Sequence, residues 1–138
     1  MTTKARVVRV TEELEREIAR EAEARGKSWP ATATELLAEA VRMRQAPGVV
    51  FLTGPAGCRA VLAGAGLDVW EVVSTWRALG ESLDALKEAY SWLTESQLRA
   101  ALRYYRLFPA EIEDRLRREE AWTAERVRQE LPFAAPWG

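Results

Sequence analysis

The sequence predicts a mainly α-helical protein with one N-terminal strand and a short β-hairpin, and two patterns predict this fold class. Apolar residues recur every three or four positions over most of 12–45 and 67–120, as they do in helices with one buried face. Between these regions lie two short extended runs, 49–52 and 58–62. The turn-forming stretch Gly54-Pro-Ala-Gly57 separates the two runs, and this order is typical of a hairpin.

The N-terminal residues Arg6–Thr11 predict the strand. Val8 and Val10 alternate with Val7 and Arg9, so one face of the strand is apolar and suited to burial. A lone strand has two unpaired edges, and such an edge is a template for pairing. We therefore expect two copies of the chain to pair their strands antiparallel around a two-fold axis.

Two helices are expected after this strand. The hydroxyl of Thr11 can cap the first helix, and Gly26 is a natural stop for it. The second helix is expected to begin near Thr32, because Thr32 and Glu35 have the spacing of a capping box. A proline–glycine pair after residue 46 ends this second helix and the N-terminal unit with it.

One strand followed by two helices of this size resembles the ribbon-helix-helix family of DNA-binding proteins. The spacing from Thr11 to Gly26 and the capping-box pair carry the resemblance. It implies that the paired strands enter the major groove as a ribbon and that their outward residues contact bases. It also implies that the start of the second helix faces a phosphate. The residues expected at DNA are Lys4, Arg6, Val7, Arg9, Thr32 and Thr34.

Two features differ from the ribbon-helix-helix pattern. Val7 stands where a polar residue is usual, and the loop between the helices, expected over Lys27–Ala31, is longer than usual. Arg9 suits a bidentate contact with guanine. If Arg9 is only a solvated strand residue, the ribbon serves for dimerisation alone, and the sequence leaves both alternatives open.

Residues 48–138 are expected to form a second unit, after a first unit of residues 1–47. Beyond the hairpin, two short helices joined by a tight turn, with a third helix beside them, are typical of a helix-turn-helix. Arg99 and Arg103 lie on the exposed face of its last helix and are expected to contact DNA. Glu95 precedes Arg99 by four residues, so an ion pair on the helix surface is the alternative.

Four motifs of the second unit resemble one bacterial family: Gly54-Pro-Ala-Gly-Cys-Arg-Ala-Val-Leu-Ala-Gly64, Leu67-Asp-Val-Trp-Glu-Val-Val73, Gln97-Leu-Arg-Ala-Ala-Leu-Arg-Tyr-Tyr105 and Pro109-Ala-Glu-Ile-Glu113. The family is the one called domain of unknown function 433, and the resemblance covers roughly residues 49–118. Its members resemble the antitoxin half of toxin–antitoxin pairs and are often encoded beside a PIN-like nuclease toxin. The resemblance implies a helix-turn-helix core and a role in neutralising a partner, and it brings no catalytic or ligand residue.

A long C-terminal helix is expected from Pro109 to about Glu130, followed by a tail with two prolines and two aromatic residues. Trp122, Phe133 and Trp137 are the expected partner-binding residues, because buried aromatic side chains dominate the energy of many protein interfaces. The alternative is that these aromatic residues dock on the chain's own core or on the second copy of the chain.

The residue counts exclude several kinds of site. The chain has one cysteine and no histidine, which excludes an internal disulfide, a histidine-centred triad and any metal site with a histidine ligand. We therefore expect neither enzymatic activity nor a cofactor. No apolar run is long enough to cross a bilayer and no signal peptide opens the chain, so a cytoplasmic protein without membrane contact is expected.

The patterns together predict a DNA-binding antitoxin or transcriptional repressor that acts as a homodimer or higher homo-oligomer. Its expected partners are operator DNA and a PIN-like nuclease toxin. The formal net charge of −1 favours the alternative, a dimeric interaction module that binds a protein partner without DNA. The salt dependence of DNA binding separates these two functions.

Overall fold

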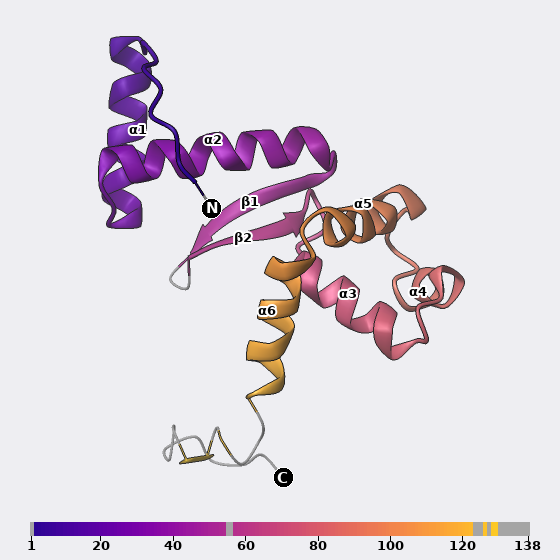
Figure 1. Ribbon diagram of the computed structural model, residues 1–138. Helices are drawn as coiled ribbons and strands as arrows, with labels where there is room; N and C mark the ends of the chain where they lie inside the picture. The colour runs from indigo at the N-terminus through magenta and orange to yellow at the C-terminus, as the bar shows by residue number, and fades with distance from the viewer. Residues whose placement is uncertain (1, 55–56, 123–125, 127, 130–138) are drawn as a thin grey trace.

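The computed structural model describes residues 2–54, 57–122, 126 and 128–129, and this part of the chain is mainly helical with one two-stranded sheet (Figure 1). The elements in chain order are α1 (Glu12–Arg25), α2 (Trp29–Gln45), β1 (Val49–Gly54), β2 (Gly57–Leu62), α3 (Val69–Ala78), α4 (Leu83–Ala89), α5 (Glu95–Leu107) and α6 (Pro109–Glu120). The helix α1 lies across one end of α2, the hairpin runs beneath α2, and α3–α6 gather at the other end of the molecule (Figure 1). The mainly helical class and the hairpin are confirmed.

Both predicted ends of α1 are confirmed. The Thr11 hydroxyl accepts a hydrogen bond from the Leu14 N–H at 3.1 Å, which satisfies one of the donors that a helix start leaves free. Gly26 closes the helix in the left-handed conformation, with φ at 65°. Glycine adopts this conformation without the steric penalty that a Cβ atom brings.

The helix α2 begins at Trp29 rather than near Thr32. Ser28 is its N-cap and accepts a hydrogen bond from the Ala31 N–H at 3.3 Å. Pro30 lies in the first turn, where its fixed φ favours a helix and its missing N–H costs nothing. Ser28 and Pro30 together therefore start the helix before Thr32. The capping box expected at Thr32 is therefore wrong.

The connection between α1 and α2 is consequently short. It consists of residues 26–28, so the long loop expected over Lys27–Ala31 is also wrong. The indole N–H of Trp29 donates to the carbonyl of Glu15 at 3.2 Å and ties the start of α2 to the middle of α1. One of the two differences from the ribbon-helix-helix pattern is thereby removed.

The strands β1 and β2 pair antiparallel, with Val49 opposite Leu62 at the open end and Gly54 opposite Gly57 at the tip. Val49 and Leu62 are both buried, whereas the tip is more exposed. The open end of the hairpin therefore belongs to the core, and the tip projects from it along α2 (Figure 1).

The core lies among α3, α4, α5, α6 and the open end of the hairpin. Its fully enclosed side chains are Ala46, Val49, Leu62, Val69, Val72, Val73, Leu86, Leu98, Ala101 and Tyr104. On α5 the side chains of Leu98, Ala101 and Tyr104 are fully buried, whereas the adjacent Tyr105 is only partly buried. Both tyrosines border the helical stripe, and only the packing of neighbouring elements decides which of them is enclosed.

The C-terminal helix is shorter than expected, because α6 ends at Glu120 and does not run on to about residue 130. Ile112 and Leu116 bury its inner face, but the next position of this stripe is the polar Glu119. The Trp122 N–H donates to the carbonyl of Glu119 at 3.1 Å and tightens the last turn. Beyond Leu116 the helix has no apolar face to bury, so packing does not stabilise further turns.

The helix α2 leads from the N-terminal pair of helices directly into the core. Ala46, just after it, is fully buried. A Cβ atom on Gly48 would lie 3.2 Å from the Cβ of Ala100 on α5. Arg103 of α5 donates from Nε to the carbonyl of Gln45 at 2.9 Å and so binds the last turn of α2. These contacts cross the position of the predicted boundary between residues 47 and 48.

Candidate nucleic-acid and partner interfaces

Residues 2–11, the N-terminal segment, lie outside the helices and the hairpin. All of their side chains are exposed, and Val8 is 73% exposed. Three cations of the segment form no ion pair with any described residue: Lys4, Arg6 and Arg9. In the single chain the segment is neither helix nor strand, so the expected ribbon, which requires a second chain, stays a prediction.

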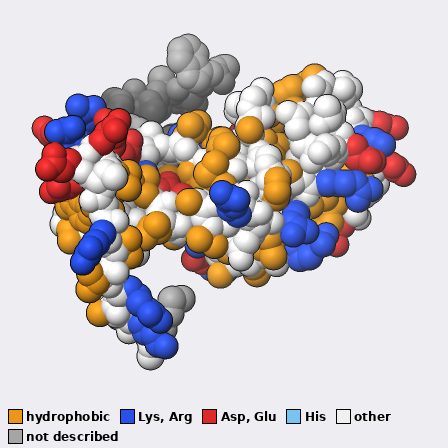
Figure 2. Space-filling view, turned by 90° about the horizontal axis from the view of Figure 1, so that it is seen from above, with side chains coloured by type: hydrophobic (Ala, Val, Ile, Leu, Met, Phe, Trp, Pro, Cys, Tyr) orange, Lys and Arg blue, Asp and Glu red, His pale blue; other side chains and the backbone are white. Residues whose placement is uncertain are grey.

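The helices α1 and α2 also leave large apolar side chains exposed, and we call Leu14, Leu37 and Val41 the open apolar face. Leu37 is 66% and Val41 is 56% exposed. The two helices bury little in return, namely Ile18, Ala22 and Thr32. Figure 2 shows the molecule from above, with orange hydrophobic and blue basic side chains mixed in its middle and red acidic ones mainly towards its two ends. Exposed apolar surface of this kind is typical of an interface.

The guanidinium of Arg25 joins α1 to α2. Its side chain is 6% exposed and pairs with Glu21 of α1 and with Glu35 and Glu39 of α2, at 3.2–3.3 Å. Burial opposes the charge, but the carboxylates, Glu39 foremost, hold the pKa of Arg25 above its ordinary value. The spacing of four residues indicates the pair of Arg25 with Glu21, but no spacing indicates the two glutamates of α2, which lie on another helix.

Cys58 extends this cluster to the hairpin. Its thiol donates to Oε1 of Glu39 at 2.7 Å and so links β2 to α2. Burial, followed by the nearby Glu39 carboxylate, raises the pKa of Cys58 to about 11. A thiol with a raised pKa forms little thiolate and is a poor nucleophile. The arrangement therefore makes Cys58 a structural contact.

The two threonines expected at a phosphate both bond back onto α2. The Thr32 hydroxyl donates to the carbonyl of Ser28 and the Thr34 hydroxyl to the carbonyl of Pro30, each at 2.9 Å. Thr32 is fully buried inside the helix, so its expected position at an exposed helix start is wrong. Thr34 is exposed, and a ligand can reach it.

The arginines of α5 have partners within the chain. Arg99 lies 3.5 Å from Glu95, the ion pair that the spacing of four residues indicated as the alternative. The Nε of Arg103 is held by the carbonyl of Gln45, as described above. Both side chains are nevertheless exposed, and the sequence could not indicate the partner of Arg103, which lies 58 residues away.

Two sets of tyrosine, glutamate and arginine hold α6 against its neighbours. The Tyr104 hydroxyl donates to Glu111, and Arg42 of α2 donates to Tyr104 at 3.1 Å and to Glu111 at 2.7 Å. Burial, and then the Glu111 carboxylate, raise the pKa of Tyr104. A second set on α5, α6 and α3 is bonded in the same way: Tyr105, Glu113 and Arg77. The structure thereby assigns a positioning role to polar residues that the sequence left without one.

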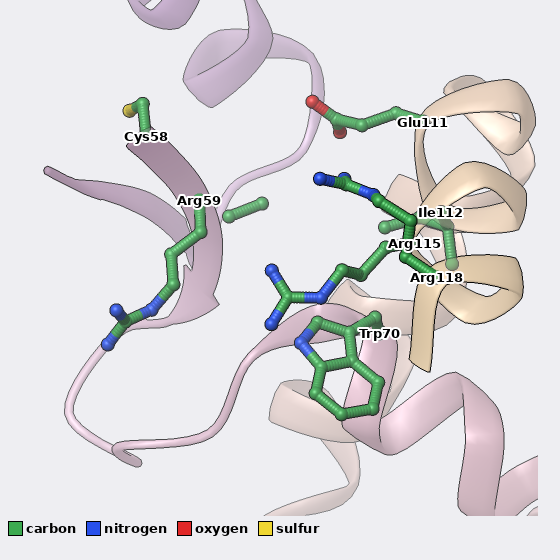
Figure 3. A pocket seen from close by; sticks show the side chains of 8 residues that line it. Cys58, Arg59, Trp70, Glu111, Ile112, Arg115 and Arg118 are labelled. Carbon is green, nitrogen blue, oxygen red and sulfur yellow. The ribbon is translucent and has the colours of Figure 1, made fainter. Parts of the chain in front are cut away.

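A small pocket of about 60 Å³, here called the arginine pocket, lies between β2, the start of α3 and α6 (Figure 3). Its lining residues are Cys58, Arg59, Ala60, Trp70, Glu111, Ile112, Arg115 and Arg118. The guanidinium of Arg115 lies 5.0 Å from the centre of the Trp70 ring, which is favourable for a cation–π contact. The walls come from three separate elements, so the sequence pattern alone does not indicate the pocket.

Trp122 follows the end of α6 and is 51% exposed. It borders a shallow groove with Arg117 and Arg118, and the guanidinium of Arg126 lies 5.9 Å from its ring. The other two expected partner-binding residues, Phe133 and Trp137, lie outside the described residues. Trp122 is thus the described aromatic of this region that a partner can reach.

Two searches of the described residues returned nothing. No group of three or more cysteine, aspartate or glutamate side chains in the described part of the chain is arranged to hold a metal ion. No described helix combines the length and the apolar character that crossing a membrane requires.

Comparison with known proteins gives one match, and it covers part of the chain. Residues 54–105 match the model of a family described as "Protein of unknown function (DUF433)". The match runs from the end of β1 through α5 and confirms the resemblance of this region to that family. No curated protein and no solved structure gives a match.

Proposed function

We propose that the protein is a homodimeric DNA-binding regulator, of the antitoxin or transcriptional-repressor kind, whose paired N-terminal segments enter the major groove. The observation that carries the proposal is the N-terminal segment itself. It exposes apolar and basic side chains together and has no partner strand within the described part of the chain. An extended segment with unpaired backbone groups is a template for a second strand.

The dimer follows from the apolar side chains of the first unit. In a two-fold pair of strands, Val8 and Val10 would point inward, over the open apolar face of α1 and α2. A second copy would then complete the core that these helices lack. Small units with too little core of their own are commonly stabilised by such association.

DNA binding follows from the other side of the same strands. Val7, which is 98% exposed, and Arg9 would point outward from both copies of the ribbon. A two-stranded ribbon fits the major groove, where arginine bonds guanine and a valine methyl can touch the methyl group of thymine. Lys4 and Arg6 at the ribbon's ends, and the exposed Thr34, would contact the phosphates.

The second unit would hold a protein partner. Trp122, exposed at the end of α6, is the described residue that we propose for this interface, and a PIN-like nuclease toxin is the proposed partner. The exposed Arg99 and Arg103 are proposed as additional DNA contacts of α5. We propose a cytoplasmic protein without enzymatic activity, in keeping with these binding roles.

A dimeric interaction module without DNA binding is the second candidate. The charges of α5 favour it, because Arg99 has an ion pair with Glu95 and Arg103 bonds the end of α2. The net charge of −1 also favours it. This candidate shares the dimer and the protein partner with the first.

Fluorescence anisotropy tests DNA binding. The full chain is titrated into a labelled duplex from upstream of its own coding sequence and into a scrambled duplex. We expect selective binding, with log affinity falling against log salt by about 0.9 for each phosphate contacted. Arg9→Ala should weaken binding by about 1–3 kcal/mol and reduce selectivity. Arg20→Ala, which removes an exposed arginine from α1, is the control and should keep the selectivity.

Two outcomes would reject selective DNA binding and favour the interaction module. One is no binding of either duplex at low salt. The other is equal binding of the two duplexes by the wild type and by Arg9→Ala.

Sedimentation tests the dimer separately. Val8→Ser should weaken association at least about tenfold, because each copy loses a buried apolar side chain, and Val7→Ser should leave it unchanged. Equal effects of the two substitutions would exclude the ribbon dimer.

A further inference from the structure

Glu111 lines the arginine pocket, and Asp68 bonds two of the lining residues. Neither carboxylate has an oxygen without a hydrogen bond. In Asp68, Oδ1 accepts from Arg59 at 3.1 Å and Oδ2 accepts from the Trp70 indole at 3.2 Å. The two oxygens of Glu111 accept from Arg42 and Tyr104. Because their oxygens already accept hydrogen bonds within the fold, these carboxylates compete weakly with an external anion for the arginines of the pocket.

The arginines of α6 have donors to spare. Arg115 uses its Nε for Glu119, at 2.7 Å, and its terminal nitrogens bond no described residue. Arg118 forms neither a hydrogen bond nor an ion pair with any described residue. Figure 3 shows both side chains reaching from α6 toward the space in front of β2. A guanidinium is a planar group with five N–H donors. The guanidinium groups of Arg115 and Arg118 can therefore donate together to both oxygens of one carboxylate.

The walls of the pocket make such a contact stronger than one at an open surface. Trp70, Ile112 and Ala60 contribute apolar surface beside the two arginines. Ion pairs and charged hydrogen bonds gain strength where apolar walls exclude water. The volume of about 60 Å³ accommodates a single small anionic group rather than a large ligand.

We infer that the arginine pocket binds the carboxylate of an aspartate or glutamate side chain from a protein partner, between Arg115 and Arg118 and over Trp70. A peptide can follow its acidic residue with an apolar one that packs on the same walls. A nucleic-acid backbone instead presents a row of phosphates, which suits an open basic surface. The inference is independent of DNA binding, because none of these residues lies in the N-terminal segment.

A peptide titration of the full chain tests the inference by NMR. The probe is acetyl-Ala-Leu-Glu-Ala-Leu-amide, and the same peptide with glutamine is its control. We expect the Glu peptide to shift the indole N–H of Trp70 and the Nε–H of Arg115 with saturation, and the Gln peptide to shift neither. Arg118→Gln should lower the affinity about tenfold by removing charge-assisted hydrogen bonds. Arg117→Gln, at a neighbouring exposed arginine paired with Asp114, should leave it unchanged.

Three results would overturn the inference. The first is no saturable shift with the Glu peptide in the wild-type chain, a measurement that needs no substitution. The second is an equal loss of affinity in the Arg118→Gln and Arg117→Gln variants. The third is a shift with inorganic phosphate or duplex DNA where the Glu peptide causes none, because the pocket would then belong to a phosphate group. Because Arg118 is exposed, its variant should keep the far-UV circular dichroism of the wild type.

Discussion

The N-terminal and C-terminal regions of this chain differ in how far they bury their apolar side chains. The hairpin and α3–α6 enclose a continuous core that includes Val72, Leu98 and Tyr104, all fully buried. The helices α1 and α2 enclose little, and they expose Leu37 and Val41 instead. The hairpin and α3–α6 bury most of their apolar side chains against one another, whereas α1 and α2 leave apolar surface that no described residue covers. Association is therefore expected to depend on the N-terminal region.

The polar contacts of the two regions also differ, because those of the C-terminal region adjoin a packed core and those of the N-terminal region do not. Around Arg25, a nearly buried cation is surrounded by three carboxylates, an arrangement that fixes geometry while contributing little net stability. In the C-terminal region the polar sets around Tyr104 and Tyr105 lie at the edge of an existing core. Geometry in the N-terminal region thus depends on charges, and in the C-terminal region on packing.

Truncating one leucine in each region tests this contrast, and it should give the largest effect. Leu98→Ala opens a cavity in a closed core and should lower the free energy of unfolding by about 2–5 kcal/mol. Leu37→Ala should change it by less than about 0.5 kcal/mol in dilute monomeric protein. Urea unfolding of both variants measures the difference. Equal losses would mean that α2 is packed as tightly as α5, against the contrast.

Removing one carboxylate from the Arg25 cluster should have a smaller effect. Glu39→Ala leaves the buried guanidinium with fewer acceptors and should cost about 1–3 kcal/mol of unfolding free energy. Glu17→Ala breaks an exposed pair with Arg20 and should cost no more than about 0.5 kcal/mol. Thermal unfolding of the two variants provides the comparison. If both substitutions were equally mild, the cluster would not fix α1 against α2.

The thiol of Cys58, where the two regions meet, should react with an alkylating agent at a rate that depends on pH and on folding. Its pKa of about 11 in the fold, against 9.0 as its ordinary value, favours the protonated thiol. The stabilising effect is therefore complete below the ordinary pKa and is lost as the pH rises through about 11. At pH 8, iodoacetamide should alkylate the native chain about 100-fold more slowly than the unfolded chain.

Mass spectrometry of the alkylated chain measures this rate across pH. Glu39→Gln should speed the reaction of native Cys58, because it removes a negative charge that disfavours the thiolate. The unfolded chain in urea is the control and should react alike in both forms. A native rate that levels off near pH 9 would contradict the raised pKa.

Structural features that depend on residues close together in the sequence were mostly predicted correctly. Thr11 and Gly26 were each expected at an end of α1 and occupy those positions. The predicted start of α2 was wrong, since Ser28 and not Thr32 caps this helix. A capping motif needs only three or four adjacent residues, so sequence shows it directly.

Contacts between residues far apart in the sequence were not predicted. Arg103 lies on an exposed helical face in the sequence pattern, yet its partner is the last carbonyl of α2. Arg115 and Trp70 meet in the arginine pocket although α3 and α6 are separated by two other helices in the chain. Such contacts depend on how the elements pack, which local spacing does not specify.

The sequence by itself determined the helical class, the hairpin and the alternation of the N-terminal segment, because each depends on a short-range pattern of apolar and turn-forming residues. It also determined that no histidine chemistry is available. Only the tertiary structure decided that Tyr104 is buried, that Arg25 is enclosed by glutamates and that Arg115 and Arg118 line one pocket. The physical reason is that burial and ion pairing depend on neighbours in space, and packing alone selects those neighbours.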